Sequence, residues 1–142
     1  MSRMRKDLPP KKKKVLEWKI NWEVPTLDLC KKMKELGYPQ NKRGWRWVEI
    51  LEEGKTSSWH LISPYEDPEE YAYVKGDIVS QIIYAPTNGE LGEQLPEGFC
   101  EFKFNNKFWI KNKEDYDYLV SDDIEVNARS NMWIWLRKNG YI

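Results

Sequence analysis

The chain has 142 residues, of which 40% are hydrophobic, 14% aromatic and 32% charged. This length is typical of a single domain, and twenty aromatic residues, eight of them Trp, supply a core rich in rings. That composition excludes a disordered chain, because disorder goes with few aromatic residues. The net charge is zero, yet residues 1–14 carry +6 and the remainder therefore carries −6.

The charge asymmetry divides the chain into two parts. Residues 1–14 contain two adjacent prolines and the run Lys11, Lys12, Lys13 and Lys14, which cannot bury apolar surface, so we predict a flexible basic arm. Residues 15–142 are predicted to form one α+β domain.

The first predicted elements of the domain are a strand and a helix. Residues 15–22 alternate loosely and favour a strand. Thr26 is a suitable N-cap for a helix, and Gly37 followed by Pro39 ends it. The apolar positions between these signals recur at near-helical spacing, with lysines on the opposite side.

A run of strands follows. Residues 44–52 contain Trp and Val, which favour a pleated surface, and residues 56–62 return as the partner strand of a hairpin across a Glu-Gly turn. Residues 64–70 are interpreted as an acidic loop. Residues 78–84 are predicted to form a further strand.

Turn and cap signals organise the next segment. Residues 86–96 are predicted to form a short helix capped by Thr87, with Glu90 completing a capping box. Residues 99–104 and 107–111 flank Asn105-Asn106, two residues that tolerate positive φ, which indicates a tight hairpin.

The last predicted elements are an edge strand over residues 116–120 and a C-terminal helix that Asp122 or Asp123 would cap and Gly140 would end. Its predicted buried face is Ala128, Met132, Trp135 and Leu136. The element order favours an α+β fold: an antiparallel sheet of about four to six strands with an N-terminal and a C-terminal helix packed on it.

Few residues could support catalysis or bind a metal ion. His60 is the single histidine, and the two cysteines, Cys30 and Cys100, are 70 positions apart. A zinc site needs about four clustered Cys or His ligands, and a catalytic nucleophile needs a base within reach. We therefore predict no catalytic, cofactor or metal site, a non-enzymatic protein, and free cysteines that behave as small apolar residues.

The sequence also bears on location. The first ten residues lack the apolar run of a signal peptide, and no stretch approaches the roughly 18 apolar residues of a membrane span. We expect a cytoplasmic protein that does not contact membranes, in a compartment that keeps its thiols reduced.

Two surfaces are candidates for binding. The lysine run of the arm could contact phosphates, and a Trp among lysines on a strand could stack on bases. This nucleic-acid hypothesis assigns Lys11, Lys12, Lys13, Lys14, Lys103, Lys107, Trp109 and Lys111. The net negative charge of the rest of the chain opposes binding to a polyanion.

The second candidate surface is a protein interface. Eight tryptophans exceed the needs of a core this size, and Trp is enriched in protein interfaces. That hypothesis assigns Trp18, Trp22, Trp45 and Trp133 as partly exposed interface residues.

Three segments resemble small uncharacterised proteins encoded by bacteriophages and prophages. They are residues 27–40 (LDLCKKMKELGYPQ), 85–96 (APTNGELGEQLP) and 125–132 (EVNARSNM), the last followed by Leu136 and a Gly-Tyr-Ile ending. The resemblance implies a phage origin and a small αβ domain, and it implies no catalytic residues.

The resemblance also orders the functional hypotheses. Small phage proteins without enzyme motifs often bind a host protein. The first hypothesis is therefore a protein-interaction module, such as an inhibitor of a host defence protein of the anti-CRISPR or other anti-defence type. The alternative is a small nucleic-acid-binding protein that uses the arm and the Trp/Lys strand face.

Overall fold

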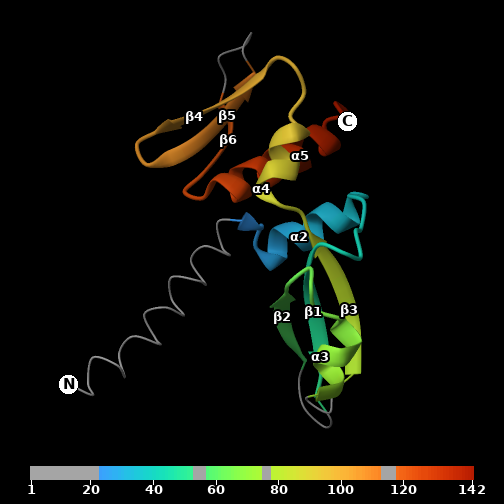
Figure 1. Ribbon diagram of the computed structural model, residues 1–142. Helices are drawn as coiled ribbons and strands as arrows, with labels where there is room; N and C mark the ends of the chain where they lie inside the picture. Colours follow the sequence, from blue (N-terminus) through green and yellow to red (C-terminus); the bar gives the residue numbers. More distant parts are fainter. Residues whose placement is uncertain (1–22, 53–56, 75–77, 113–117) are drawn as a thin grey trace, which may run out of the picture.

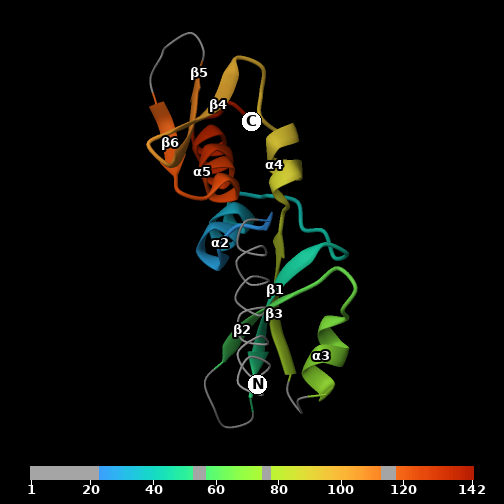
Figure 2. The same ribbon diagram turned by 60° about the vertical axis from the view of Figure 1, so that its left-hand side comes forward.

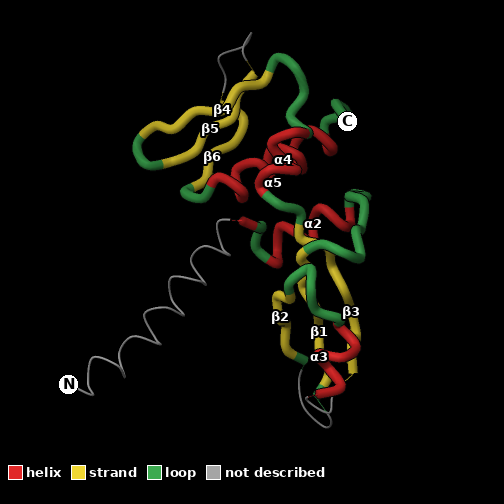
Figure 3. The backbone as a smooth tube through the Cα atoms, in the orientation of Figure 1, coloured by secondary structure: helices red, strands yellow, loops and turns green. Residues whose placement is uncertain are grey.

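The computed structural model describes residues 23–52, 57–74, 78–112 and 118–142. The predicted arm and the predicted strand over 15–22 lie outside these ranges. The described elements are α2 (Leu27–Glu35), β1 (Trp45–Leu51), β2 (Ser58–Ile62), α3 (Pro68–Val74), β3 (Ile78–Ala85), α4 (Asn88–Glu93), β4 (Phe99–Phe104), β5 (Lys107–Asn112), β6 (Tyr118–Asp122) and α5 (Glu125–Lys138) (Figures 1 and 3).

The protein is α+β, as predicted, but the prediction of one sheet with a helix from each end of the domain is wrong. The described strands form two antiparallel sheets of three, in the orders β2-β1-β3 and β4-β5-β6. Figure 1 shows the sheets at opposite ends of the molecule, with α2, α4 and α5 between them. The chain leaves β3 through α4, which packs on α5, and so β4 starts a separate sheet.

The helix α2 forms where its caps predict. The Thr26 hydroxyl accepts a hydrogen bond from the amide of Leu29, and Gly37 adopts a φ of 91°, which residues with a side chain rarely reach. Cys30 and Met33 are buried on its inner side. They share a core with Ile83 of β3, and the side chains of Trp47 and Trp59 pack against this core.

The helix α3 covers the opposite face of the first sheet, where we predicted only an acidic loop. Val48, Ile50, Ile62 and Ala72 form a second small core there. The missed signal is Asp67-Pro68: an Asp at the N-cap position followed by Pro at the first helical position is a helix start. The Asp67 carboxylate indeed accepts a hydrogen bond from the amide of Glu69.

The helix α4 forms over part of the predicted range. Thr87 caps it as predicted, but the Glu90 side chain does not complete the predicted capping box. The Thr87 hydroxyl accepts a hydrogen bond from the amide of Glu90. The Glu90 side chain accepts a hydrogen bond from the hydroxyl of Tyr84 on β3. Burial and this bond together raise the pKa of Tyr84, so the phenol stays protonated and α4 is tied to the first sheet.

The helix α5 lies between the two cores. Ala128, Met132 and Leu136 are buried against the second sheet with Trp135 beside them, which confirms the predicted face. Val126, Trp133 and Ile134 are buried on the other side, in the core shared with α2. A helix that is apolar on two sides must be covered on both, and this explains why α5 joins the two halves of the molecule.

The start of α5 differs from the prediction. Its N-cap position is Ile124, without a side-chain cap, so neither Asp122 nor Asp123 caps the helix. The Asp122 carboxylate instead accepts a hydrogen bond of 2.9 Å from the amide of Ile124, one residue before the helix. Across all the described ranges, no helix combines the length and apolar character needed to cross a membrane.

Candidate nucleic-acid interface

The hairpin of β4 and β5 sets the geometry of the candidate site. Asn105 and Asn106 have φ values of 51° and 59°, as a two-residue turn that matches the strand twist requires. The turn fixes the register, so Phe104 pairs with Lys107 and Phe102 pairs with Trp109. Residues directly opposite in an antiparallel pair share a face, and each strand therefore divides cleanly between the two sides of the sheet.

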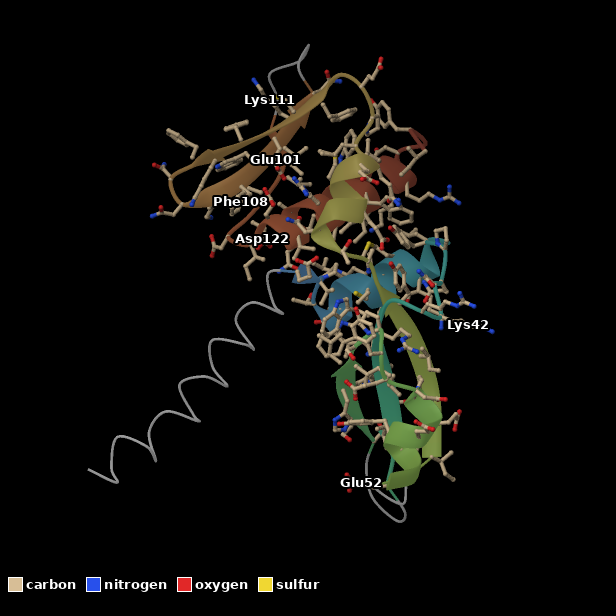
Figure 4. All side chains as sticks on the ribbon, viewed as in Figure 1. Lys42, Glu52, Glu101, Phe108, Lys111 and Asp122 are labelled. Atoms are coloured by element: carbon tan, nitrogen blue, oxygen red, sulfur yellow. The ribbon has the colours of Figure 1, made fainter. Side chains whose placement is uncertain are left out.

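The inner face of this sheet packs on α5. Ile110 is fully buried against Met132 and Leu136, and Phe99 and Phe108 pack around it. Figure 4 shows Glu101 and Phe108 on the side of the sheet toward α5. α5 covers this face, and the alternate residues of both strands face the other way.

The outer face, which we call the platform, carries three aromatic rings and two lysines. Its members in the register are Cys100, Phe102, Phe104, Lys107, Trp109 and Lys111. Phe104 is 60% exposed. The indole N–H of Trp109 donates a 3.0 Å hydrogen bond to the carbonyl of Phe104, and the Lys111 ammonium lies 5.9 Å from the centre of the Phe102 ring.

The structure brings together some of the predicted nucleic-acid contacts and separates others. Lys107, Trp109 and Lys111, at alternate positions of β5, share the platform. Lys103 lies on the inner face opposite Phe108, 5.5 Å from the centre of that ring, because it is one residue out of phase with Phe102 and Phe104. Lys103 therefore does not belong to the platform, and its assignment as a nucleic-acid contact stays a prediction. Lys11 to Lys14 lie outside the described residues.

Sequence reasoning left two members of the platform unassigned. Phe102 and Phe104 lie on this face, but the nucleic-acid hypothesis does not include them. The signal was present, because aromatic residues at alternate positions facing away from a covering helix have no core to fill. What the sequence does not reveal is which face of the hairpin α5 covers.

A partly buried ion cluster fixes the sheet to the helices. The guanidinium of Arg129 on α5 donates to both carboxylate oxygens of Glu101, at 3.0 and 2.9 Å, and to the carbonyl of Asn88 at 2.7 Å. Glu125 lies 3.6 Å from the same guanidinium. Arg129 packs so closely on α4 that a Cβ at Gly92 would lie 2.6 Å from its Nη1.

The two carboxyl groups of this cluster differ in acidity. Burial raises the pKa of Glu101, and the neighbouring Glu125 raises it further against the opposing effect of Arg129. Burial also acts to raise the pKa of Glu125, but the hydrogen bonds with Asn88 and Glu101 and the charge of Arg129 more than offset it, so its pKa is lowered. Two carboxyl groups thus share the guanidinium of Arg129. The ion pair with Arg129 holds Glu101 on the inner face, so the negative charge of Glu101 is not on the platform.

Of the tryptophans predicted to form a protein interface, the structure describes Trp45 and Trp133. Trp133 is 9% exposed and packs edge-on against Tyr38, with ring centres 4.9 Å apart. Its predicted exposure is wrong, because α5 is covered on both sides. Trp45 is half-buried and packs on the same core. Trp18 and Trp22 lie outside the described residues.

The two cysteines are free and lie in opposite environments. Cys30 is fully buried, and burial raises the pKa of its thiol to about 12. Cys100 is half-buried on the platform, paired in the ladder with Lys111.

Alkylation should separate the two thiols. With iodoacetamide at pH 8, we expect Cys100 to react and Cys30 to stay unmodified, because the thiolate is the nucleophile and little of it forms at a pKa of about 12. Peptide mass spectrometry reads the sites, and urea should make both reactive. Labelling of Cys30 at a rate similar to Cys100 in the folded protein would contradict the described burial.

The single histidine joins β2 to α3. Its Nε2 lies 2.8 Å from the Ser58 hydroxyl and its Nδ1 lies 3.2 Å from the Tyr71 hydroxyl. A Ser-His pair is the arrangement of a nucleophile and its base, but such a pair also needs donors that converge on a reacting oxygen. We interpret the contacts of His60 as a structural link. Within the described ranges, no group of three or more Cys, His, Asp or Glu side chains is arranged to hold a metal ion.

Comparisons of the chain with models of protein families, with curated proteins and with solved structures found no match. The phage origin suggested by the three sequence segments therefore stays a prediction. The functional argument rests on the side chains described above.

Proposed function

We propose that this protein binds single-stranded nucleic acid on the platform, with bases stacked on its rings and phosphates held by its lysines. The observation that carries the proposal is the gathering of Phe102, Phe104 and Trp109 with Lys107 and Lys111 on the sheet face that α5 does not cover. Rings beside cations on an open surface are the usual components of a sequence-tolerant site for single strands.

The exposure of Phe104 supports stacking. A Phe side chain left 60% exposed at the end of a hairpin gives up most of the stabilisation that burial would provide. Every nucleic-acid base offers a flat apolar face, and stacking one base on an aromatic side chain contributes about 1–3 kcal/mol. Trp109 sits beside Phe104 through its hydrogen bond to the Phe104 carbonyl, so adjacent bases could use adjacent rings.

The local charge supports binding to a polyanion, although the domain as a whole is acidic. Lys107 and Lys111 face outward, and among the described strand positions none on this face carries a carboxylate. Glu101 and Asp122 lie on the inner face, the first paired with Arg129. Figure 4 shows Lys111 on the far side of the sheet from these acids.

The shape of the site favours a strand whose bases are unpaired. A duplex shows its phosphates and groove edges outside, and most proteins read it with a helix or ribbon set into a groove. A broad sheet face with projecting rings instead meets the flat side of bases, which only an unpaired strand presents. The inhibitor hypothesis rests on the phage resemblance and on the number of tryptophans, of which Trp133 is buried, so it has less support than the platform.

Binding of dye-labelled dT12 and rU12 to the full chain, followed by fluorescence anisotropy, tests the proposal. Phe104→Ala and Trp109→Ala should each weaken binding by about 1–3 kcal/mol, which is roughly 5- to 150-fold. Tyr65→Ala is the matched control, because Tyr65 is 98% exposed but lies far from the platform in sequence, between β2 and α3. It should leave the affinity unchanged.

A matched pair of lysines tests the charge. Lys107→Glu should weaken binding. It should also make the slope of log K against log salt concentration less steep by about 0.7, the loss of one phosphate contact. Lys103→Glu makes the same charge change in the same hairpin but on the inner face, and should have a smaller effect. Equal effects of the two substitutions would contradict a binding site confined to the outer face of the sheet. No binding of either oligonucleotide at low salt would overturn the proposal and favour a protein partner.

A further inference from the structure

A basic recess lies beside the platform, where two helices meet the edge strand β6. Lys32 of α2 and Lys138 of α5 line it together with Ser121 of β6 and Asn131 and Trp135 of α5, and its volume is about 350 Å³. Figure 2 shows β6, α5 and α2 next to one another. The recess was not foreseen, because the lysines of α2 were interpreted only as its solvent side.

The two lysines come together because α2 and α5 run side by side in the same direction. The amide of Thr26 donates to the side chain of Asn127 near one end, and the guanidinium of Arg137 donates to the carbonyl of Leu36 near the other. The C-terminal turns of both helices therefore lie at the same end. Lysines there complement the helix dipoles, but that effect does not require them to face one recess.

The recess has the donors that bind a phosphate. Neither Lys32 nor Lys138 has an ion-pair partner among the described residues. The neighbouring lysines of α2 are engaged elsewhere: Lys31 lies 4.8 Å from the centre of the Trp59 ring, and Lys34 donates to the carbonyl of Ile82. Ser121 and Asn131, two residues with neutral donor groups, also line the recess.

The recess and the platform meet at one residue. Ser121 lines the recess and is also the partner of Trp109 in the β5–β6 ladder. A strand stacked on Trp109 and crossing β6 would therefore reach the two lysines next.

We propose that this recess is a phosphate subsite for the same single strand, so that a backbone phosphate flanking the bases on the platform is held by Lys32 and Lys138. The inference rests on the proposed function and deepens it, because it gives the strand a path across β6 and a minimum length. A strand too short to extend beyond the platform would not use the recess.

Oligonucleotide length and two matched double variants test this path in the full chain. K32Q/K138Q should weaken dT12 binding by roughly ten- to thirtyfold at 0.1 M salt, the loss of two phosphate contacts, and leave dT4 binding unchanged. K31Q/K34Q removes the same charge from α2 alone and should change neither. All four lysines lie on helices with exposed outer sides, and thermal melting checks that each variant stays folded.

Each other outcome overturns the subsite, and one of them separates it from the platform. If the wild type binds dT12 and Phe104→Ala weakens that binding while K32Q/K138Q does not, the platform stands and the subsite fails. Equal losses in both double variants indicate a general charge effect and also overturn it. If inorganic phosphate binds in a titration and that binding is lost in K32Q/K138Q without a change for dT12, the recess takes a free anion and not the strand. If the wild type binds no oligonucleotide, the proposed function fails first.

Discussion

Replacing Arg129 by Met should destabilise the fold by about 3 kcal/mol at pH 7, near the lower end of what breaking a buried ion pair costs. The substitution keeps the apolar stem but leaves Glu101 without its two hydrogen bonds and Glu125 without its nearby cation. The lower end applies because the Arg129 side chain retains 18% exposure. Urea unfolding measures the loss.

The effect should depend on pH with a definite sign. Burial already raises the pKa of Glu101, and without the guanidinium that pKa should rise further. The pKa of Glu125 loses one of the influences that lower it. Groups with a raised pKa in the folded state lose stability as the pH rises through that pKa. The difference between Arg129→Met and wild type should thus shrink from pH 7 toward pH 4, where the carboxyls bind protons.

Arg137→Met is the control for this variant. Arg137 is on the same helix, is exposed, and donates one hydrogen bond to the carbonyl of Leu36. Its replacement should cost only about 1 kcal/mol and should show no such pH dependence. A loss at Arg129 no larger than at Arg137, or one that does not change with pH, would contradict the described cluster.

Ile110→Ala should cost about 2–5 kcal/mol, because it deletes a fully buried side chain from the core between β5 and α5. That is a large share of the roughly 5–15 kcal/mol that stabilises an ordinary domain. Ile78→Ala makes the same change on β3 at a position that is 71% exposed, and should cost well under half as much. If Ile110→Ala does not fold, Ile110→Val should still cost about 0.5–1.5 kcal/mol.

Substitutions of two neighbouring residues on β5 should have different effects on stability and on nucleic-acid binding. Ile110 faces α5 and Trp109 faces outward. Trp109→Ala should therefore lose nucleic-acid affinity with a smaller loss of stability than Ile110→Ala, although it removes the larger side chain. If Trp109→Ala unfolds the protein more readily than Ile110→Ala, the sides of the sheet are assigned wrongly.

Features that depend on neighbouring residues could be predicted from the sequence. Thr26 and Thr87 cap the helices α2 and α4, and Asn105-Asn106 form the turn that sets the β4–β5 register. In each case, a short segment determines its own structure through hydrogen bonds or permitted φ values. The shared face of Lys107, Trp109 and Lys111 follows from the alternation of side chains along one strand.

Features that depend on distant residues could not be predicted. The residues in and next to α4 do not indicate that this helix packs on α5 and separates the strands into two sheets. The burial of Trp133 requires α2 to cover the side of α5 that faces away from the second sheet. The basic recess joins Lys32 and Lys138, which are more than 100 residues apart in the chain. Pairing of strands and helices across such separations is set by the assembled core.

Photocrosslinking tests the central claim most directly. A dT12 oligonucleotide carrying 5-iodouracil at each position in turn would be irradiated with the full chain, and the attached peptides located by mass spectrometry. The platform predicts crosslinks to β4 and β5, at Phe104 or Trp109, that disappear in Phe104→Ala/Trp109→Ala. Crosslinks confined to residues 1–22, or none in a sample that binds the oligonucleotide, would contradict a strand stacked on this sheet.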